Sequence, residues 1–441
     1  MNLEHYLSAV READLVDRSG RVTHSYGLVV EAKGPDAFVG EVCEICPGTR
    51  AERVPAEVVG IKDGKVLLMP YSGLHGVRLG SEVIATGKPL QIPVGETLLG
   101  RVVDAFGAPL DGRPAPECRE RYGFRAEPLN PLSRASIRDV LETGVKAIDT
   151  LLTTGKGQRM GIFSGSGVGK STLLGMIARK VRADVNVIAL VGERGREVRE
   201  FIDRVLGAEG TARSVVVVAT SDQPALVRSS AAYAATAIAE YFRDQGRSVA
   251  LIMDSLTRFA MARREIGLAI GEPPTARGYT PSVYMCLSTL IERCGTSTAG
   301  GTITALYTAL MEGDDLNDPI VDTMRSLLDG NIVLSRELAN QGHYPAIDVL
   351  RSTSRLLPHI VDRDTLRMVQ QAVAMLSTYE KSRELIEIGA YRAGSNADTD
   401  RAIRLLPELN KFLRQDMGDW IPRDEALRAL KGALARGEHA S

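Results

Sequence analysis

The chain has 441 residues, a length that allows roughly three domains with one large core among them. Its 54 lysines and arginines balance 55 aspartates and glutamates, and the resulting net charge of −1 excludes a protein that binds nucleic acid through overall phosphate attraction. With 44% hydrophobic and 25% charged residues, the composition is that of a soluble globular protein and excludes disorder as the dominant state.

The N-terminal region predicts two elements. Residues 1–20 place Leu3, Leu7 and Val10 at helical spacing, which predicts a short amphipathic helix. From residue 21 to 94, short β-branched runs such as GLVVEA and KVLLM are separated by turn residues. This punctuation predicts a small antiparallel β-barrel or sandwich.

A different pattern begins at residue 95 and continues to residue 357, where apolar runs alternate with helical segments. The runs are RMGIFS, VNVIALVG, SVVVVAT, SVALIMD and GTITALYTAL. Continuous runs of this kind are typical of strands buried on both faces, so we predict an α/β domain with a parallel sheet wrapped by helices. Residues 358–441 show helical periodicity without strands, which predicts a C-terminal helical domain.

The segment GIFSGSGVGKST joins a strand, a glycine-rich turn and the start of a helix. Glycines let backbone N–H groups surround a phosphate, the helix N-terminus adds partial positive charge, a lysine reaches the terminal phosphates, and the next hydroxyl is a ligand for Mg²⁺. The segment therefore predicts a site for a nucleoside triphosphate, formed by Gly165, Ser166, Gly167, Val168, Gly169, Lys170, Ser171 and Thr172.

Two residues outside this turn bear on the same site. The usual pattern has glycine where this chain has Ser164, which we regard as compatible because a small residue can turn at a strand end with little strain. The strand SVALIMD ends in Asp254, as expected for the carboxylate that helps hold Mg²⁺ through water. Ser171 and Asp254 are therefore the predicted metal residues.

Together with this loop, five further segments resemble the rotary ATPase superfamily of the ATP synthase alpha/beta type, and within it most closely the flagellar kind of type III protein export ATPases. They are LVGERGREVREF, ALIMDSLTRFAMARREI, ARGYTPSVY, EGDDLNDPIVD and HYPAIDVLRSTSRLLP. The resemblance implies a RecA-like core between an N-terminal barrel and C-terminal helices. It also implies hydrolysis of ATP with Mg²⁺.

The resemblance implies roles for individual residues. Glu193 in VGERGRE is similar to the general base that orients the attacking water, and Arg194 to a residue that holds the surrounding network. Arg355 in STSR resembles the arginine finger that projects into the neighbouring subunit's site, worth on the order of 10³ to 10⁵ in rate. Tyr344 in HYPAID resembles the aromatic residue that stacks on adenine. The implied catalytic set is Lys170, Glu193, Arg194, Asp254 and Arg355.

The resemblance also implies an assembly. It predicts a homohexamer with a stator-like regulatory protein at the N-terminus, a central stalk protein, export-gate membrane proteins, chaperone–cargo complexes and no nucleic acid. We expect a cytoplasmic protein, peripheral at most to the inner membrane, because no apolar run approaches the ~18 residues that cross a bilayer and the N-terminus has no signal-peptide core. For residues 1–20, packing on the barrel is the alternative to stator binding.

The cysteines and histidines predict no further chemistry. Five cysteines are an odd number in a long chain, which argues against a disulfide framework. Cys43 and Cys46 have redox-type spacing, but there is no second pair, so we expect neither a redox pair nor a zinc site there.

Several alternative functions stay open. A virulence-type export ATPase would share nearly all these motifs, although EAKGPDAFVGEVCEI is more similar to flagellar sequences. A catalytic subunit of a rotary ATP synthase usually has GGAGVGKT where this chain has SGSGVGKS, and an acidic C-terminal segment that is missing here. An RNA translocase related to the termination factor Rho needs aromatic platforms, yet residues 21–94 contain only Tyr26, Phe38 and Tyr71. A noncatalytic ring subunit is opposed by Glu193.

Overall fold

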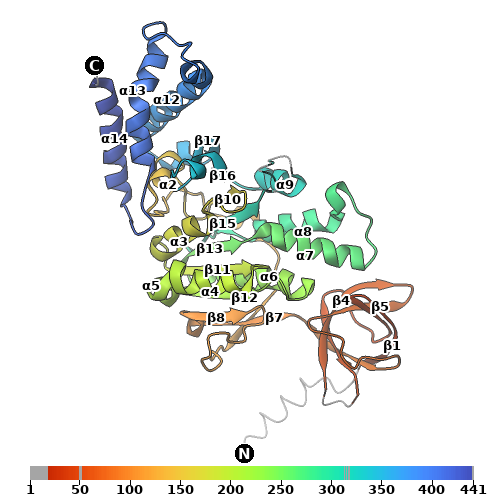
Figure 1. Cartoon of the computed structure of the whole chain (residues 1–441). Helices are drawn as coiled ribbons and strands as arrows, with labels where there is room; N and C mark the ends of the chain where they lie inside the picture. The colour runs from red at the N-terminus through yellow and green to blue at the C-terminus, as the bar shows by residue number, and fades with distance from the viewer. Residues whose placement is uncertain (1–17, 49–51, 312, 314, 316–317, 440–441) are drawn as a thin grey trace, which may run out of the picture.

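The computed structural model describes residues 18–48, 52–311, 313, 315 and 318–439. In chain order they form a β-barrel, a central domain on a large sheet, and a group of long helices (Figure 1). The barrel and the C-terminal helices lie on opposite sides of the central domain. Most of the helix predicted for residues 1–20 lies outside the described residues, and its last two positions already belong to a strand, Ser19–Tyr26.

The N-terminal strands close into a barrel in the order β1-β2-β5-β4-β3-β6. They are β1 (Ser19–Tyr26), β2 (Val29–Lys33), β3 (Glu41–Cys46), β4 (Val54–Lys62), β5 (Lys65–Pro70) and β6 (Glu82–Pro89). Side chains alternate between the two sides of the wall, and in β3 both Cys43 and Ile45 are fully buried. Of the two predicted architectures, the chain adopts the barrel. Cys43 and Cys46 lie within it, and neither forms a disulfide.

A two-stranded ribbon links the barrel to the central domain. It pairs β7 (Gln91–Val94) with β9 (Glu120–Gly123), and the short helix η1 (Glu96–Leu98) follows β7. Between the ribbon strands, β8 (Arg101–Asp104) joins the edge of the central sheet beside β12. Arg101 Nε donates to Asp111 at 2.7 Å, which holds the loop after β8 against the sheet.

The central sheet has nine strands in the order β17-β16-β10-β15-β13-β11-β12-β8, with β14 beside β15. Its later members are β10 (Arg159–Ser164), β11 (Val185–Val191), β12 (Ser214–Ala219), β13 (Ser248–Asp254), β14 (Gly295–Thr296), β15 (Thr302–Leu310), β16 (Gly330–Leu334) and β17 (Ile347–Ser354). Neighbours run parallel except β17 against β16 and β14 against β15. The predicted parallel sheet is confirmed, and ligands of such sheets bind at the carboxyl ends of the strands.

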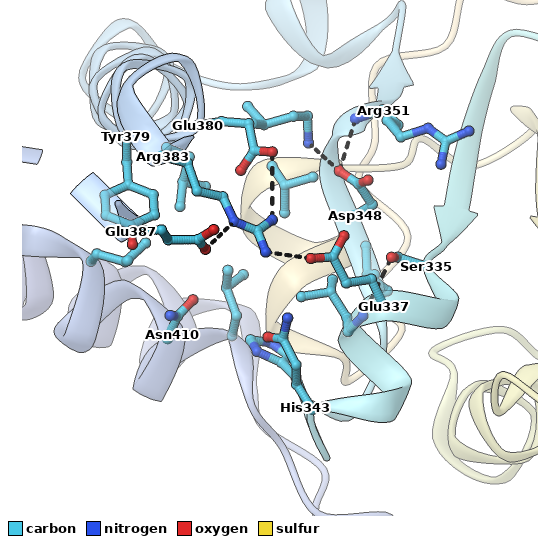
Figure 2. A pocket seen from close by; sticks show the side chains of 18 residues that line it. Ser335, Glu337, His343, Asp348, Arg351, Tyr379, Glu380, Arg383, Glu387 and Asn410 are labelled. Carbon is cyan, nitrogen blue, oxygen red and sulfur yellow. Dashed lines mark hydrogen bonds and ion pairs between the residues drawn. The ribbon is translucent and has the colours of Figure 1, made fainter. Parts of the chain in front are cut away.

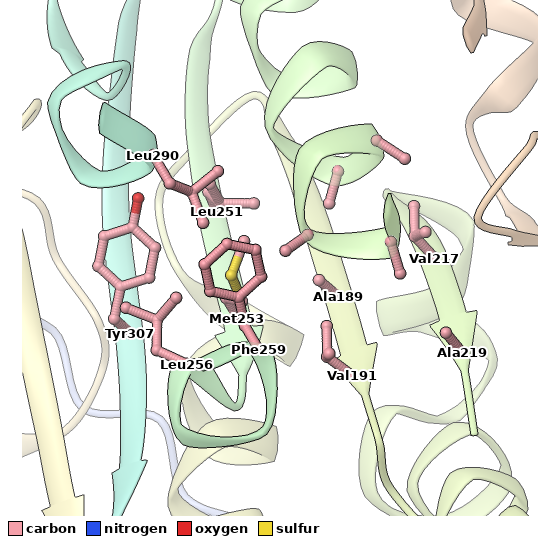
Figure 3. Close-up of a cluster of buried hydrophobic side chains, with 14 of the residues drawn as sticks. Ala189, Val191, Val217, Ala219, Leu251, Met253, Leu256, Phe259, Leu290 and Tyr307 are labelled. Carbon is pink, nitrogen blue, oxygen red and sulfur yellow. The ribbon is translucent and has the colours of Figure 1, made fainter. Parts of the chain in front are cut away.

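Helices cover both faces of this sheet. Along β11, Val187 and Ala189 pack with α6, α7 and α8, whereas Ile188 and Leu190 pack with α2, α3 and the C-terminal helices. Figure 3 shows part of the first layer, where Phe259 lies over the strands. The helices are η2 (Pro131–Ser133), α2 (Lys146–Leu151), α3 (Lys170–Lys180), α4 (Gly195–Glu200), π-helix η3 (Phe201–Leu206), α5 (Gly207–Ala212), α6 (Ala225–Asp244), α7 (Leu256–Ala269), η4 (Ala276–Gly278), α8 (Pro281–Glu292), α9 (Pro319–Leu327), α10 (Arg336–Asn340) and α11 (Leu357–Ile360).

The C-terminal domain is helical, as predicted. It consists of α12 (Arg363–Glu387), α13 (Ala397–Leu413) and α14 (Arg423–His439). Asp362 and Asn396 cap the first two, accepting hydrogen bonds from backbone N–H groups in the first turn. Leu405 and Leu430 are fully buried in the layer that includes β10. Within the described part of the chain, no helix combines the length and the apolar composition that a bilayer crossing requires.

Candidate active site

The glycine-rich turn lies between the carboxyl end of β10 and the first turn of α3. Gly167 and Gly169 have φ of 77° and 94°, a left-handed conformation that side chains with a Cβ rarely adopt. Gly169 directly precedes α3, so the turn ends at the N-terminus of this helix. Ser164, which stands where glycine is usual, is fully buried as the last residue of β10. The turn therefore has the backbone geometry of a phosphate cradle.

Lys170, the first residue of α3, points to the end of the neighbouring strand β13. Its Nζ forms an ion pair with Asp254, whose side chain is only 5% exposed. The hydroxyl of Thr308 in β15 donates a hydrogen bond to Asp254 Oδ1 at 2.8 Å. The lysine and the carboxylate predicted for phosphate and metal thus meet beside the turn, and Thr308 fixes the orientation of the carboxylate.

Glu193 lies in the turn after β11 and is half-buried. A cavity of about 220 Å³ has Ser171, Glu193 and Asp254 among its lining residues. Burial, followed by the negative charge of Asp254, raises the pKa of Glu193 to about 7. A carboxyl group with this pKa can exchange a proton near neutral pH, which is what a general base requires.

The surroundings of Glu193 refine this geometry. Gly192 has φ of 72°, and a Cβ there would lie 3.0 Å from Arg258 Cβ, so the start of α7 packs directly on the turn. Arg258 lowers the pKa of Glu193, whereas a hydrogen bond with Glu197 raises it. Arg194 lies at the exposed rim of this cluster: its side chain is 74% exposed and contacts Glu197 at 3.8 Å.

Tyr344 lies on the other side of the glycine turn. A Cβ added to Gly169 would be 3.4 Å from the Tyr344 ring. The ring is 45% exposed, which leaves an aromatic face open beside the cradle. Tyr344 therefore lies where a base attached to a bound phosphate chain could stack on it.

The loop between α13 and α14 reaches the same place. Gln415 N donates to Tyr344 O at 2.9 Å, while its side chain accepts from Lys146 N at 2.8 Å and donates to Gly144 O at 2.7 Å. Gln415 is 7% exposed, so these bonds are shielded from water. One residue thus connects the helical domain, α2 and the Tyr344 loop.

Arg355 lies far from its own cradle. It follows Ser354, which pairs with Gly330, and Gly330 pairs with Met160 near the start of β10. The cradle begins only after Ser164, a further four residues along β10, or roughly 13 Å at 3.3 Å per residue. Arg355 therefore lies level with the amino end of β10, at the opposite end of that strand from the cradle. The guanidinium is exposed and donates to Arg325 O at 3.1 Å.

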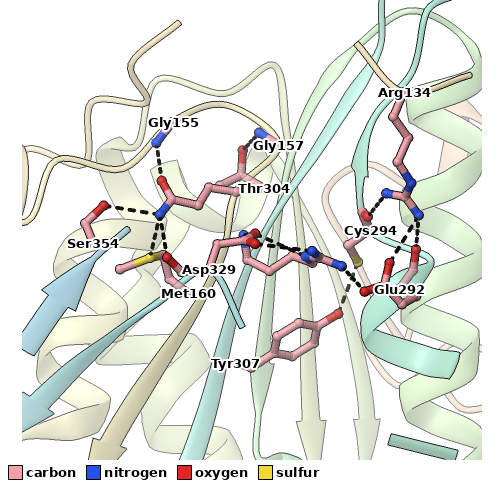
Figure 4. Close-up of polar contacts among 12 residues, drawn as sticks. Arg134, Gly155, Gly157, Met160, Glu292, Cys294, Thr304, Tyr307, Asp329 and Ser354 are labelled. Carbon is pink, nitrogen blue, oxygen red and sulfur yellow. Dashed lines mark hydrogen bonds and ion pairs between the residues drawn. The ribbon is translucent and has the colours of Figure 1, made fainter. Parts of the chain in front are cut away.

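A polar network holds together the strand ends next to Arg355 (Figure 4). Gln158 Nε2 donates to Ser354 Oγ at 3.2 Å, and Arg355 N donates to Asp329 O at 3.0 Å. Arg159 binds Asp329 through Nε at 3.1 Å. These bonds join β10, β16 and β17 at their matching ends, so the backbone of Arg355 is held firmly while its side chain stays accessible.

A larger cavity of about 420 Å³ lies between β17 and the helices α12 and α13 (Figure 2). Arg383 reaches into it and forms an ion pair with Glu337, and a second with Glu387 at 2.8 Å. His343, the residue before Tyr344, also lines it. This cavity has no part in the cradle, since none of the phosphate-loop residues lines it.

Known proteins match the chain along almost its whole length. Residues 22–87 match the beta-barrel domain and residues 144–354 the nucleotide-binding domain of the ATP synthase alpha/beta family. Residues 361–432 match the T3SS EscN ATPase C-terminal domain. The chain is 52% identical to the flagellum-specific ATP synthase of Bacillus subtilis over 439 residues, which covers 99% of this chain and 100% of the relative.

The chain belongs to the protein-export ATPases of the ATP synthase alpha/beta family. It is 50% identical to the type 3 secretion system ATPase of Xanthomonas euvesicatoria, over 94% of this chain and 93% of the relative. Two solved structures of EscN from enteropathogenic E. coli are similar, one of the assembled ATPase and one of its complex with the central stalk EscO. Their TM-scores are 0.89 and 0.87 at 43% and 42% identity, and each covers 94% of this chain and 100% of the EscN chain.

The sequence analysis did not identify Thr308, Glu197 or Gln415 as parts of this site. Glu197 is a second carboxylate only four residues after Glu193, in the first turn of the following helix, and that closeness in sequence could have indicated it. Thr308 is a buried polar residue within an apolar strand, which is a weaker signal. Gln415 contacts Lys146 across 269 residues of sequence, and no local pattern indicates such a contact.

Proposed function

We propose that this protein hydrolyses ATP at the interfaces of a homohexameric ring and that hydrolysis supports the export of flagellar proteins. The observation that carries the proposal is the position of Arg355. The cradle, Lys170 and Glu193 lie at the carboxyl ends of the parallel strands, and Arg355 is exposed at the opposite end. In a ring, the surface of each subunit that carries Arg355 would face the cradle of its neighbour, and every site would then be complete.

The cradle supports binding of the triphosphate. The backbone N–H groups of residues 165–172, the N-terminus of α3 and the Lys170 ammonium would bind phosphate oxygens, which would take the place of Asp254 as partners of Lys170. The adenine would stack on the open face of Tyr344. The roles of these residues rest on their positions beside the turn.

The residues beside the cradle fit Mg²⁺. The Ser171 hydroxyl and the Asp254 carboxylate offer oxygen atoms, the ligands that this ion prefers, and both line the cavity next to Glu193. When bound, Mg²⁺ would neutralise negative charge on the phosphates.

Hydrolysis needs a base on one side of the terminal phosphate and a cation that stabilises the developing charge. Glu193 in its ionised form would orient the attacking water, and Arg355 of the adjacent subunit would stabilise charge on the transferring phosphoryl group. Arg194 is exposed and contacts Glu197, the hydrogen-bond partner of Glu193, so it would hold the network around Glu193 from the solvent side.

The choice between flagellar and virulence-type export follows the relatives. The similar proteins of Bacillus subtilis and Xanthomonas euvesicatoria are named for the flagellar and the type 3 secretion system, at 52% and 50% identity, and the first match spans the whole relative. A central stalk protein would occupy the ring as EscO does with EscN. Stator, export gate and chaperone–cargo complexes remain predicted partners, and attachment to the membrane would depend on them.

Mixing two inactive variants tests the shared site. Rings of Arg355→Ala and Glu193→Gln subunits contain interfaces in which an intact cradle faces an intact arginine. At equal amounts, random assembly makes roughly one interface in four complete, so about a quarter of wild-type ATPase activity is expected.

The matched control mixes Lys170→Ala with Glu193→Gln. Both defects lie in the same half of the site, so no hybrid interface is complete and no activity returns. Equal rescue in both mixtures, or none in either, contradicts a site shared between subunits.

A further inference from the structure

A cavity of about 400 Å³ lies where the barrel approaches α7 and α8, which we call the junction cavity. Figure 1 shows the two green helices beside the barrel. The walls are largely apolar and combine three parts of the chain: Val39 and Val59 of the barrel, Ile266 and Ile270 at the end of α7, and Met285 of α8. Its volume lies in the range of about 300–1,000 Å³ that small-molecule sites have.

Arg263 of α7 brings a positive charge into this apolar space. Its Nε is buried and has no hydrogen-bond partner, and none of the carboxylates in the described residues forms an ion pair with it. Tyr233 and Cys286 are its polar neighbours, and Cys286 forms a hydrogen bond with it, but a phenol and a thiol supply no formal counter-charge. A guanidinium in this position lacks the counter-charge that buried cations normally have.

The other arginines of the cavity are satisfied. Arg125 forms an ion pair with Glu57, and Arg293 donates to Glu240 from Nε at 2.8 Å. The charge of Glu57 also acts on Arg263, but Arg125 already neutralises it.

Two carboxylates line the cavity without serving Arg263. Glu272 accepts a hydrogen bond from Ser282 N at 3.3 Å, at the first turn of α8. Glu127 is exposed, and it belongs to the segment that leads away from the barrel. Arg263 is therefore the buried charge of the cavity that remains uncompensated.

We propose that the junction cavity binds a small amphipathic organic anion. Its carboxylate would lie against Arg263, where a guanidinium and a carboxylate form two parallel charge-assisted hydrogen bonds. Its apolar body would fill the space between α7, α8 and the barrel. This site is separate from the ATP site, since the two cavities share no lining residue.

Decanoate is the probe, with 1-decanol as its uncharged counterpart. Isothermal titration calorimetry on the full chain, without nucleotide and below the micelle-forming concentration, is expected to show one decanoate per chain. Decanol is expected to bind at least tenfold more weakly, because it brings no charge to Arg263. Equal affinity for both, or no binding of decanoate, overturns the proposal.

Arg263→Met removes the guanidinium and keeps an apolar side chain of similar length, so at least a tenfold loss of decanoate affinity is expected. Arg264→Met is the matched control, since it makes the same change in net charge one position away. Arg264 packs on the Tyr279 ring and does not line the cavity. A loss of equal size in both variants contradicts the assignment.

Met285 provides a second test that does not depend on the folding of the Arg263 variant. Met285 is 67% exposed at the cavity wall, so we expect polar replacements there to leave the fold intact. Met285→Glu places a negative charge beside the ligand carboxylate and is expected to weaken decanoate binding severalfold relative to Met285→Gln. Identical affinity in the two variants shows that the anion binds elsewhere.

Discussion

At the scale of single residues, Lys170 forms an ion pair with Asp254 in the described structure. In the proposed complex with ATP, its ammonium group binds the phosphates instead. Lys170→Ala is expected to lower ATPase activity by about 10²–10³-fold or more, because a fixed positive charge is lost where negative charge develops. Steady-state phosphate release measures this. Circular dichroism is expected to be unchanged, since Thr308 still holds Asp254.

Lys180→Ala is the control for that substitution. It removes the same side chain at the far end of α3, where Lys180 is exposed. Normal turnover in Lys170→Ala, or equal losses in the two variants, contradicts the phosphate cradle.

Glu193 predicts how activity depends on pH. Because burial and Asp254 raise its pKa to about 7, the carboxyl is protonated below that pH and cannot act as a base. The kcat/KM for ATP is therefore expected to fall about tenfold per pH unit below neutrality. The low residual rate of Glu193→Gln should not follow this curve, although Mg-ATP still binds.

Glu197→Ala tests whether the pKa of Glu193 controls the pH profile. Its hydrogen bond raises the pKa of Glu193, so its removal should shift the acid limb of the profile to lower pH. A profile that stays in place, or moves to higher pH, means that another group controls it.

Residue by residue, the sequence predicted the half of the site that is local in the chain. The turn from Gly165 to Thr172 is contiguous, and its chemistry can be read from residue types at fixed spacing. The orientation of Asp254 by Thr308 depends on strand order, since β13 and β15 are neighbours although 54 residues separate the pair. Periodicity identifies strands but does not determine which strands become neighbours.

At the scale of elements, the Gln415 contacts join α2 and the α13–α14 loop to the turn that carries Tyr344. Gln415→Ala removes the partner of Lys146 N and leaves Gly144 O with only the 3.3 Å bond from Ile421 N, at a cost of about 1–3 kcal/mol. We expect a lower thermal unfolding temperature and a higher KM for ATP, with kcat changed less. Differential scanning calorimetry and steady-state kinetics test the two effects.

Gln245→Ala is the matched control, because Gln245 is exposed after α6. It should change neither quantity. A rise in KM without any loss of thermal stability would mean that Gln415 acts on the nucleotide directly.

Several elements could not be predicted. The strand at Arg101–Asp104 precedes the glycine turn by more than fifty residues, yet it joins the far edge of the sheet beside β12. The segment after Glu193 reads as one helix, but Phe201–Leu206 has π-helical bonding. A Cβ at Gly175 would be 2.0 Å from Val205 Cγ1, so close packing of α3 on this segment accompanies the irregularity. Packing between elements decides both features.

At the scale of the whole molecule, a shared site makes activity depend on assembly. ATPase activity per subunit is expected to rise with protein concentration and then level off as rings form. Light scattering at each concentration, with and without a nonhydrolysable ATP analogue, should show particle mass rising in parallel. Constant specific activity in particles of one-chain mass contradicts the ring.

The barrel has a consequence for how such particles come apart. Its six strands form a closed barrel because β6 pairs with β1, so each strand has a hydrogen-bonded neighbour on both sides. Open edges are what allow β-proteins to add foreign strands and grow into fibrils. Among the described barrel strands, a subunit released on dilution thus has no strand that lacks a neighbour on one side. We therefore expect disassembly caused by dilution to be reversed when the protein concentration is restored.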